Sequence, residues 1–164
     1  MRLNRVGLYK AFGSKYELFI LALRYYQQEL HGQLLELCVD VNVAVLVRVR
    51  RVLKLTVTIP AVRSLPRGCF ILKAGSELLP QDAGVKAVVN ESQKFLESLL
   101  VTLLQEGQQA GEVRTSVSPR AQARFVASVL TGLHVTRQLH PKSALLGDSI
   151  ELTLLALAKQ AADT

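Results

Sequence analysis

The residues that could carry out chemistry are few, and they are scattered along the 164-residue chain. The three histidines, His31, His134 and His140, lie far apart in the sequence, and none stands at the spacing of a metal site or beside a nucleophile. Cys38 and Cys69 are a lone pair without metal-binding or redox spacing, a pattern typical of buried thiols in a reducing compartment. No glycine-rich loop is spaced to hold a phosphate. These residues predict no enzyme, no metal site and no cofactor.

Glu77 is the one acidic side chain inside an otherwise apolar helical segment, residues 67–79. It could face a bound ligand, or it could make a structural hydrogen bond where two helices meet. The second role is the more common one, because buried polar groups are usually hydrogen-bonded within the protein. Glu77 is therefore a candidate ligand-binding residue with a structural role as its alternative.

The overall composition is that of a folded globular protein, with 49% hydrophobic and 20% charged residues. No uninterrupted apolar run approaches the roughly 20 residues that a membrane-spanning helix needs. Met1 is followed by polar and helix-forming sequence instead of the apolar segment of an export signal. We therefore expect a cytoplasmic protein that neither spans nor binds a membrane.

The positive charge is concentrated at one end of the chain. Residues 1–67 contain eleven Lys and Arg against four Asp and Glu, whereas residues 68–164 contain nine of each. A basic end on a neutral body fits a polyanionic partner that approaches from that end. A solvated basic surface would give the same count, so charge alone leaves both alternatives open.

Hydrophobic spacing predicts an all-helical chain with short connections. Residues 41–58 are ambiguous, because alternating valines fit a strand while one apolar stripe fits a helix; the helical neighbours favour the helix. Apolar residues cover nearly the whole circumference of residues 149–161, which predicts that a partner subunit covers part of that helix. The expected helices span about 4–12, 15–34, 41–58, 67–79, 82–110, 119–140 and 149–161.

Two stretches carry a resemblance to a known family. Residues 4–19, Asn-Arg-Val-Gly-Leu-Tyr-Lys-Ala-Phe-Gly-Ser-Lys-Tyr-Glu-Leu-Phe, resemble the end of the helix-turn-helix of TetR-family transcriptional regulators. The matching pattern is Leu-Tyr at 8–9, Phe-Gly-Ser-Lys at 12–15 and Glu-Leu-Phe at 17–19. Residues 67–78 are similar to a Gly-Cys-containing segment of the ligand-binding domains of this family.

The resemblance implies an all-α, TetR-like helical domain for ligand binding and dimerisation, over residues 20–164. Residues 1–19 would form a partial helix-turn-helix, comprising the reading helix and the start of the connecting helix. The two helices that precede the reading helix in the family have no counterpart before Met1. The implied function is that of a transcriptional repressor that senses a small molecule of unknown identity. A ligand-binding and dimerisation module without competent DNA binding is the alternative, and a small all-helical enzyme a more distant one.

The resemblance also places particular residues against DNA. Arg5 would meet a guanine edge, whereas Lys10, Tyr9 and Lys15 would contact phosphates. Without the two preceding helices we expect the chain as given to bind DNA weakly and without sequence preference, and specifically only if those helices are restored. The DNA-binding candidates are Asn4, Arg5, Gly7, Tyr9, Lys10 and Lys15.

A homodimer is the expected assembly. The helices at about 119–139 and 149–161 would form it, because two helices from each subunit give a self-complementary four-helix interface. The candidate interface residues are Phe125, Val129, Leu133, Ile150, Leu154 and Leu157.

Overall fold

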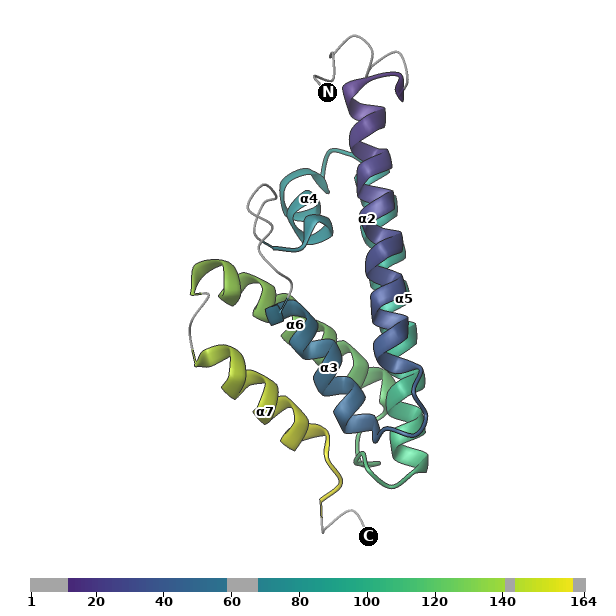
Figure 1. The fold of residues 1–164 in the computed structure, drawn as a ribbon, viewed down its shortest axis with the longest axis vertical. Coiled ribbons are helices and arrows are strands. Elements are labelled where there is room, and N and C mark those ends of the chain that lie inside the picture. Colours follow the sequence, from purple (N-terminus) through teal and green to yellow (C-terminus); the bar gives the residue numbers. More distant parts are fainter. Residues whose placement is uncertain (1–11, 59–67, 141–143, 161–164) are drawn as a thin grey trace.

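The computed structural model describes residues 12–58, 68–140 and 144–160. These ranges form the all-helical fold that the hydrophobic spacing predicts. Within them there is no β-strand, and the β-type pairing consists of one isolated bridge between Val113 and Ala158. The helices are α2 (Lys15–Cys38), α3 (Val45–Thr58), α4 (Phe70–Leu78), α5 (Ala83–Gln109), α6 (Pro119–Leu139) and α7 (Leu145–Leu157) (Figure 1).

The two longest helices, α2 and α5, lie side by side along the molecule (Figure 1). The Tyr16 hydroxyl near the start of α2 donates to Asp82 at the start of α5, over 2.8 Å. Further along, the Gln27 amide donates to the Val88 carbonyl at 3.1 Å and to the Ser92 hydroxyl at 2.9 Å. The two helices therefore run in the same direction. α4 packs on them near their first turns, whereas α3, α6 and α7 pack on one another beside the later half of α5.

Local sequence determines where these helices begin and end. At the start of α2 the Ser14 hydroxyl accepts from the Glu17 amide at 3.1 Å, and the Glu17 carboxylate accepts from the Ser14 amide, which makes a capping box. α6 begins as predicted, with Ser118 as the capping residue and Pro119 in the first turn. α5 ends just before Gly111, whose φ of 73° is accessible at little cost only to glycine.

The valine-rich segment is helical, but α3 starts at Val45 and not at Val41 as predicted. The preceding residues form a turn, in which the Asp40 carboxylate accepts from the Asn42 amide at 3.2 Å. Such side-chain hydrogen bonds compete with helix formation, which explains the late start.

The last helix, α7, begins four residues earlier than predicted and ends at Leu157. The backbone after it turns to pair with the segment that follows α5: the Arg114 amide donates to the Leu157 carbonyl, and the Lys159 amide to the Glu112 carbonyl, each at 2.9 Å. These bonds satisfy backbone groups that a longer helix would have used internally.

The buried side chains form two clusters. The larger lies among the end of α2 and helices α3, α5, α6 and α7; the smaller lies where α4 packs on the first halves of α2 and α5. The fully buried members of the larger cluster include Val49, Val52, Leu53, Leu100, Leu104, Val113, Ala123 and Val126.

One charged side chain is buried among these apolar residues. Arg48 on α3 is only 2% exposed, and its guanidinium makes a two-pronged ion pair with Glu106 on α5. It also donates to the carbonyl of Cys38, at the end of α2, at 3.0 Å. A planar guanidinium suits this role because it can satisfy several acceptors at once. Arg48 therefore ties three helices together at one end of the bundle.

Gly107 on α5 marks a close approach between α5 and its neighbours, and this gives a stability prediction. A Cβ at this position would lie 2.5 Å from the Val113 side chain and 2.8 Å from that of Val45, both of which are buried. We expect Gly107→Ala to lower the free energy of unfolding by about 1–3 kcal/mol, the usual cost of overpacking a core. Chemical denaturation of the two proteins measures this difference.

Gly32→Ala on α2 is the matched control, because a Cβ there would have no neighbour within 4 Å. It should raise stability by about 0.5–1 kcal/mol, since alanine is the better helix former. Equal effects of the two substitutions would contradict the close approach at Gly107.

Candidate functional site

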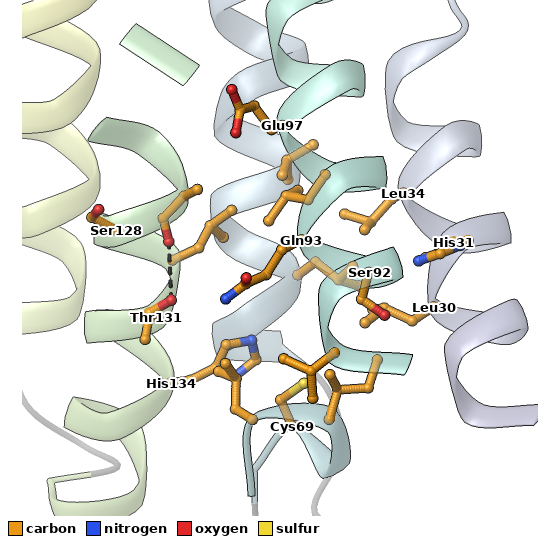
Figure 2. A pocket seen from close by; sticks show the side chains of 18 of the residues that line it. Leu30, His31, Leu34, Cys69, Ser92, Gln93, Glu97, Ser128, Thr131 and His134 are labelled. Atoms are coloured by element: carbon orange, nitrogen blue, oxygen red, sulfur yellow. Dashed lines mark hydrogen bonds between the residues drawn. The ribbon is translucent and has the colours of Figure 1, made fainter. Parts of the chain in front are cut away.

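The described structure contains a cavity of about 350 Å³ that is lined by residues of five helices. This volume lies at the small end of the range for ligand-binding pockets. Its lining comes from α2, α3, α4, α5 and α6; in Figure 2 α6 lies to the left of the lining residues and α2 to the right, with α3 and α5 between them. The residues that line it are Leu30, His31, Leu34, Val52, Leu55, Cys69, Ile71, Leu72, Val89, Ser92, Gln93, Leu96, Glu97, Arg124, Ala127, Ser128, Leu130, Thr131 and His134.

The lining is divided between apolar and polar surfaces. Residues from α2, α3 and α4 are mainly aliphatic, whereas most of the polar side chains come from α5 and α6. Figure 2 shows the Gln93 amide of α5 and the His134 ring of α6 on the same side of the cavity. The cavity is partly open, and Gln93, Ser128 and Thr131 are exposed residues of its lining.

The two histidines that face this cavity are both held in the neutral form. Burial, together with the positive charge of the nearby Arg137, lowers the pKa of His134 to about 4. Burial also lowers the pKa of His31, against an opposing effect of Glu91. The His31 ring stacks on Phe95, with centroids 3.8 Å apart, and its Nε2 is buried without a hydrogen-bond partner in the described structure.

The lowered pKa of His134 predicts a specific pH dependence of stability. Between its ordinary pKa near 6.5 and its folded value of about 4, the unfolded chain binds the proton and the folded chain does not. The contribution of neutral His134 to the free energy of unfolding is therefore fully present above pH 6.5 and is lost as the pH falls from 6.5 to about 4. From pH 7 to pH 5, His134 should account for a loss of about 2 kcal/mol.

His134→Gln removes this titration, so its free energy of unfolding should fall less than that of the wild type between pH 7 and pH 5. Urea denaturation at the two pH values gives the comparison. Parallel losses in the two proteins would show that His134 is not buried in its neutral form.

The formal charges of the cavity lining lie at Glu97 and Arg124, and they are paired. The Nε of Arg124 donates to the Glu97 carboxylate at 3.2 Å, and Arg120 approaches the same carboxylate at 3.6 Å. The two arginine side chains are about two-thirds exposed or more, so both stay hydrated. The interior beyond this pair is neutral and mostly apolar.

The described residues include only one of the predicted DNA-binding residues, Lys15. Asn4, Arg5, Gly7, Tyr9 and Lys10 lie outside the described residues. Lys15 is the first residue of α2 and is exposed, next to the capping box of that helix. α2 then continues without a break past residue 19, where the sequence suggests a domain boundary.

Glu77, the candidate ligand-binding residue, does not face the cavity. It is exposed on α4, whereas Ile71 and Leu72 of the same helix line the cavity. The helix turns its apolar side inward, so Glu77 points to solvent. The polar lining residues that sequence reasoning missed, such as Gln93, Thr131 and His134, carry no signal in the sequence other than their helical spacing.

The predicted interface residues divide into two groups. Leu133, Ile150, Leu154 and Leu157 are at most 6% exposed and belong to the core of this chain, so they are not accessible to a partner. Val129 is partly buried against that core, and only Phe125 is exposed, at 46%.

Both helices nevertheless carry a large apolar surface on their outer sides. On α6 it consists of Phe125, Val135 and Leu139, and on α7 of Leu145, Leu152 and Leu155, each 46–68% exposed. We call these six residues the α6–α7 face. Ser128 and Gly132 lie between its α6 members, and a Cβ at Gly132 would meet nothing within 4 Å. Small residues in such positions let another helix approach closely.

The cysteines are placed as the sequence suggests. Cys38 and Cys69 are buried and free. Burial raises the pKa of Cys38 to about 11, which keeps its thiol protonated at neutral pH. Among the described residues no group of three His, Cys, Asp or Glu side chains is arranged to hold a metal ion.

Sequence comparison decides which family these helices represent. The family model for the tetracyclin repressor-like C-terminal domain matches residues 45–151, well over half of the chain. The chain belongs to the TetR family. The match runs from α3 into α7 and so contains most of the cavity lining and the larger part of the α6–α7 face. No curated protein gave a significant sequence match.

Solved structures show the same TetR fold. The regulatory protein TetR from Rhodobacter sphaeroides superposes with a TM-score of 0.85 at 18% identity, covering 96% of this chain and 83% of the other. A TetR-family regulator from Agrobacterium tumefaciens gives 0.82 at 19%, covering 95% and 81%. E. coli NemR in its reduced form gives 0.80 at 17%, covering 97% and 83%. At these identities the likeness concerns the fold alone.

The predicted family and the all-α TetR-like fold are therefore confirmed. The chain carries the tetracyclin repressor-like C-terminal domain of a TetR-family transcriptional regulator. No helix in the described ranges is both long and apolar enough to cross a membrane.

Proposed function

We propose that this chain is the regulatory part of a cytoplasmic TetR-family repressor, which binds a small molecule in its cavity and acts as a homodimer. The observation that carries the proposal is the double role of α6. Ala127, Leu130 and His134 line the cavity, while Phe125 and Val135 of the same helix belong to the α6–α7 face. A ligand that displaces α6 would thus alter the surface on which two subunits meet.

The α6–α7 face supports the dimer. Two copies related by a two-fold axis would pair α6 and α7 of one subunit with the same helices of the other, and each would cover the other's apolar residues. Burial of such a surface stabilises association by roughly 25 cal/mol per Å² of apolar area removed from water. Exposed apolar patches of this kind on one side of a protein typically mark an interface.

Regulation would follow from the coupling of cavity and interface. A ligand shifts the protein between two conformations only if it binds one of them better than the other. α6 forms part of the cavity wall and also part of the α6–α7 face. A movement of α6 would therefore change the affinity of the cavity for the ligand and the shape of the dimer surface together. In this proposal the basic N-terminal residues, Lys15 included, contact DNA, and the spacing of the two copies in the dimer decides whether they fit it.

Gene deletion with complementation tests the proposal in the native host. Loss of a repressor should raise the transcripts of a small, defined set of genes, and the wild-type gene should lower them again. A gene that carries both Leu152→Glu and Leu155→Glu should fail to do so, because its product cannot dimerise. Unchanged transcripts on deletion would contradict a regulatory role, and lowered transcripts would indicate an activator.

A further inference from the structure

The polar groups that face the cavity are neutral, and several lack a partner. Within the described residues the side chains of Gln93 and His134 make no hydrogen bond to the protein, and His31 Nε2 is buried and unpaired. The hydroxyls of Ser128 and Thr131 already donate to backbone carbonyls one turn earlier, at 2.9 and 3.1 Å. The neutral groups without a partner are therefore the Gln93 amide and the two imidazoles, and the Ser92 hydroxyl, which accepts from Gln27 at 2.9 Å, can still donate.

We propose that the cavity is selective for uncharged, largely apolar molecules that carry a hydrogen-bonding group at one edge, which Gln93 and His134 recognise. The inference rests on the proposed function and adds the chemical class of the effector. The aliphatic residues from α2, α3 and α4 would cover the body of such a molecule. Its polar edge would turn toward α5 and α6, where Figure 2 shows Gln93 and His134.

Electrostatics favours the uncharged class. A charged group entering the cavity loses its hydration, and this cost is recovered only if an opposite charge or several hydrogen bonds replace the water. The lining carboxylate, Glu97, is already paired with Arg124 and Arg120, and both histidines are neutral because burial lowers their pKa. A charged effector would thus find no free counter-charge in the interior.

An amphipathic anion is the alternative that the arginines suggest. Its charged group would stay outside, beside Arg124 and Arg120, with an apolar tail in the cavity. Those guanidiniums are hydrated and share one carboxylate, so they offer weak attraction, whereas the Gln93 amide and the partly buried His134 imidazole have no partner among the described residues and can each form a hydrogen bond to a ligand. The two classes can be separated directly with matched probes.

Three two-ring molecules of similar size make the test: 2-naphthol, naphthalene and 2-naphthoate, each titrated into the purified chain at pH 7. Their fluorescence is easily followed, because the chain contains no tryptophan. We expect 2-naphthol to bind about fivefold more tightly than naphthalene, the effect of one net hydrogen bond. 2-Naphthoate should bind at least about tenfold more weakly than 2-naphthol, because its charge must be desolvated.

Variants test whether Gln93 and His134 cause the preference for 2-naphthol over naphthalene. Gln93→Leu combined with His134→Phe should bind naphthalene as the wild type does and lose the preference for 2-naphthol. Gln28→Leu on the exposed side of α2, away from the cavity, is the control and should keep that preference. Ala127→Trp should abolish binding of all three probes, because the indole would fill the cavity.

The outcomes separate this inference from the proposed function. Tightest binding by 2-naphthoate, lost in Ala127→Trp, would overturn the uncharged class while leaving the cavity as an effector site. A preference for 2-naphthol that survives in the double variant would overturn the role of Gln93 and His134. If none of the three probes binds, the inference fails and the proposed effector sensing loses its support as well.

Discussion

A chain with both Leu152→Glu and Leu155→Glu should be a folded monomer, whereas the wild-type chain should be a dimer. Both leucines are 66% exposed on α7, so two glutamates there are compatible with the fold of one subunit. In the dimer they would place unpaired charges in an apolar interface, and each such charge costs several kcal/mol. We expect the dissociation constant to rise about a thousandfold or more. Sedimentation equilibrium measures it, and circular dichroism checks that the helices remain.

Two further variants make this experiment specific. Leu35→Glu on α2, combined with Val39→Glu just after that helix, replaces side chains that are 49% and 72% exposed and should leave the dimer intact. Leu154→Glu lies only two residues from Leu152 but is 6% exposed, so it should unfold the subunit and not merely dissociate it. A wild-type chain that sediments as a monomer, or a double Leu152/Leu155 variant that stays dimeric, would refute the interface.

Removal of the partner of Arg48 should lower the stability of the subunit substantially. Glu106→Ala leaves the guanidinium, which is 2% exposed, with the Cys38 carbonyl as its remaining acceptor at 3.0 Å. Breaking a buried ion pair in this way typically costs about 3–5 kcal/mol, and the partial exposure of Glu106 places the expected loss near the lower value. Denaturant unfolding monitored by circular dichroism gives the measurement.

The double variant Arg48→Met with Glu106→Leu separates the charge from the packing. It removes both charges and keeps apolar volume, so its stability should be close to that of the wild type, as is common when a buried pair is replaced by hydrophobic residues. If Glu106→Ala costs less than about 1 kcal/mol, the pair does not hold α3 on α5 in the way that the geometry indicates.

The sequence predicts where helices form better than it predicts which residues of each helix face the core and which face the solvent. Ser118-Pro119 and Gly111 fix the ends of two helices correctly, because capping and left-handed glycine are local effects. The end of the last helix could not be predicted, since it depends on backbone bonds to residues 112–114, which are distant in the sequence.

Which apolar residues face outward is also a tertiary property. The sequence shows a last helix that is apolar nearly all round, and this predicts that two surfaces must be covered. Only the packing of α7 on α3 and α6 shows that Ile150 and Leu154 belong to the chain's own core, while Leu152 and Leu155 remain exposed. Exposed apolar residues do lie on both of these helices, but four of the six residues named from the sequence are buried in the core of the chain itself.

The cavity is the feature that the sequence predicts least. Its residues come from five helices and occupy ordinary positions in each amphipathic pattern, so nothing in the sequence marks Gln93 and His134 as parts of one cavity lining. The burial of Arg48 could not be predicted either, because a charged residue in a helix is normally exposed. Its ion-pair partner Glu106, which permits the burial, lies 58 residues further along the chain. The family match identifies the domain but not the residues that recognise a ligand.

A crystal structure of the wild-type protein with bound 2-naphthol would show the cavity and the assembly together. We expect the naphthalene rings to lie among Leu34, Leu55 and Leu130, and the hydroxyl to lie within hydrogen-bonding distance of Gln93 or His134. We also expect a two-fold axis that pairs α6 and α7 of two subunits, with Leu152 and Leu155 buried between them. An empty cavity at saturating 2-naphthol would contradict the proposed effector site, and an α6–α7 face left in solvent would contradict the proposed dimer.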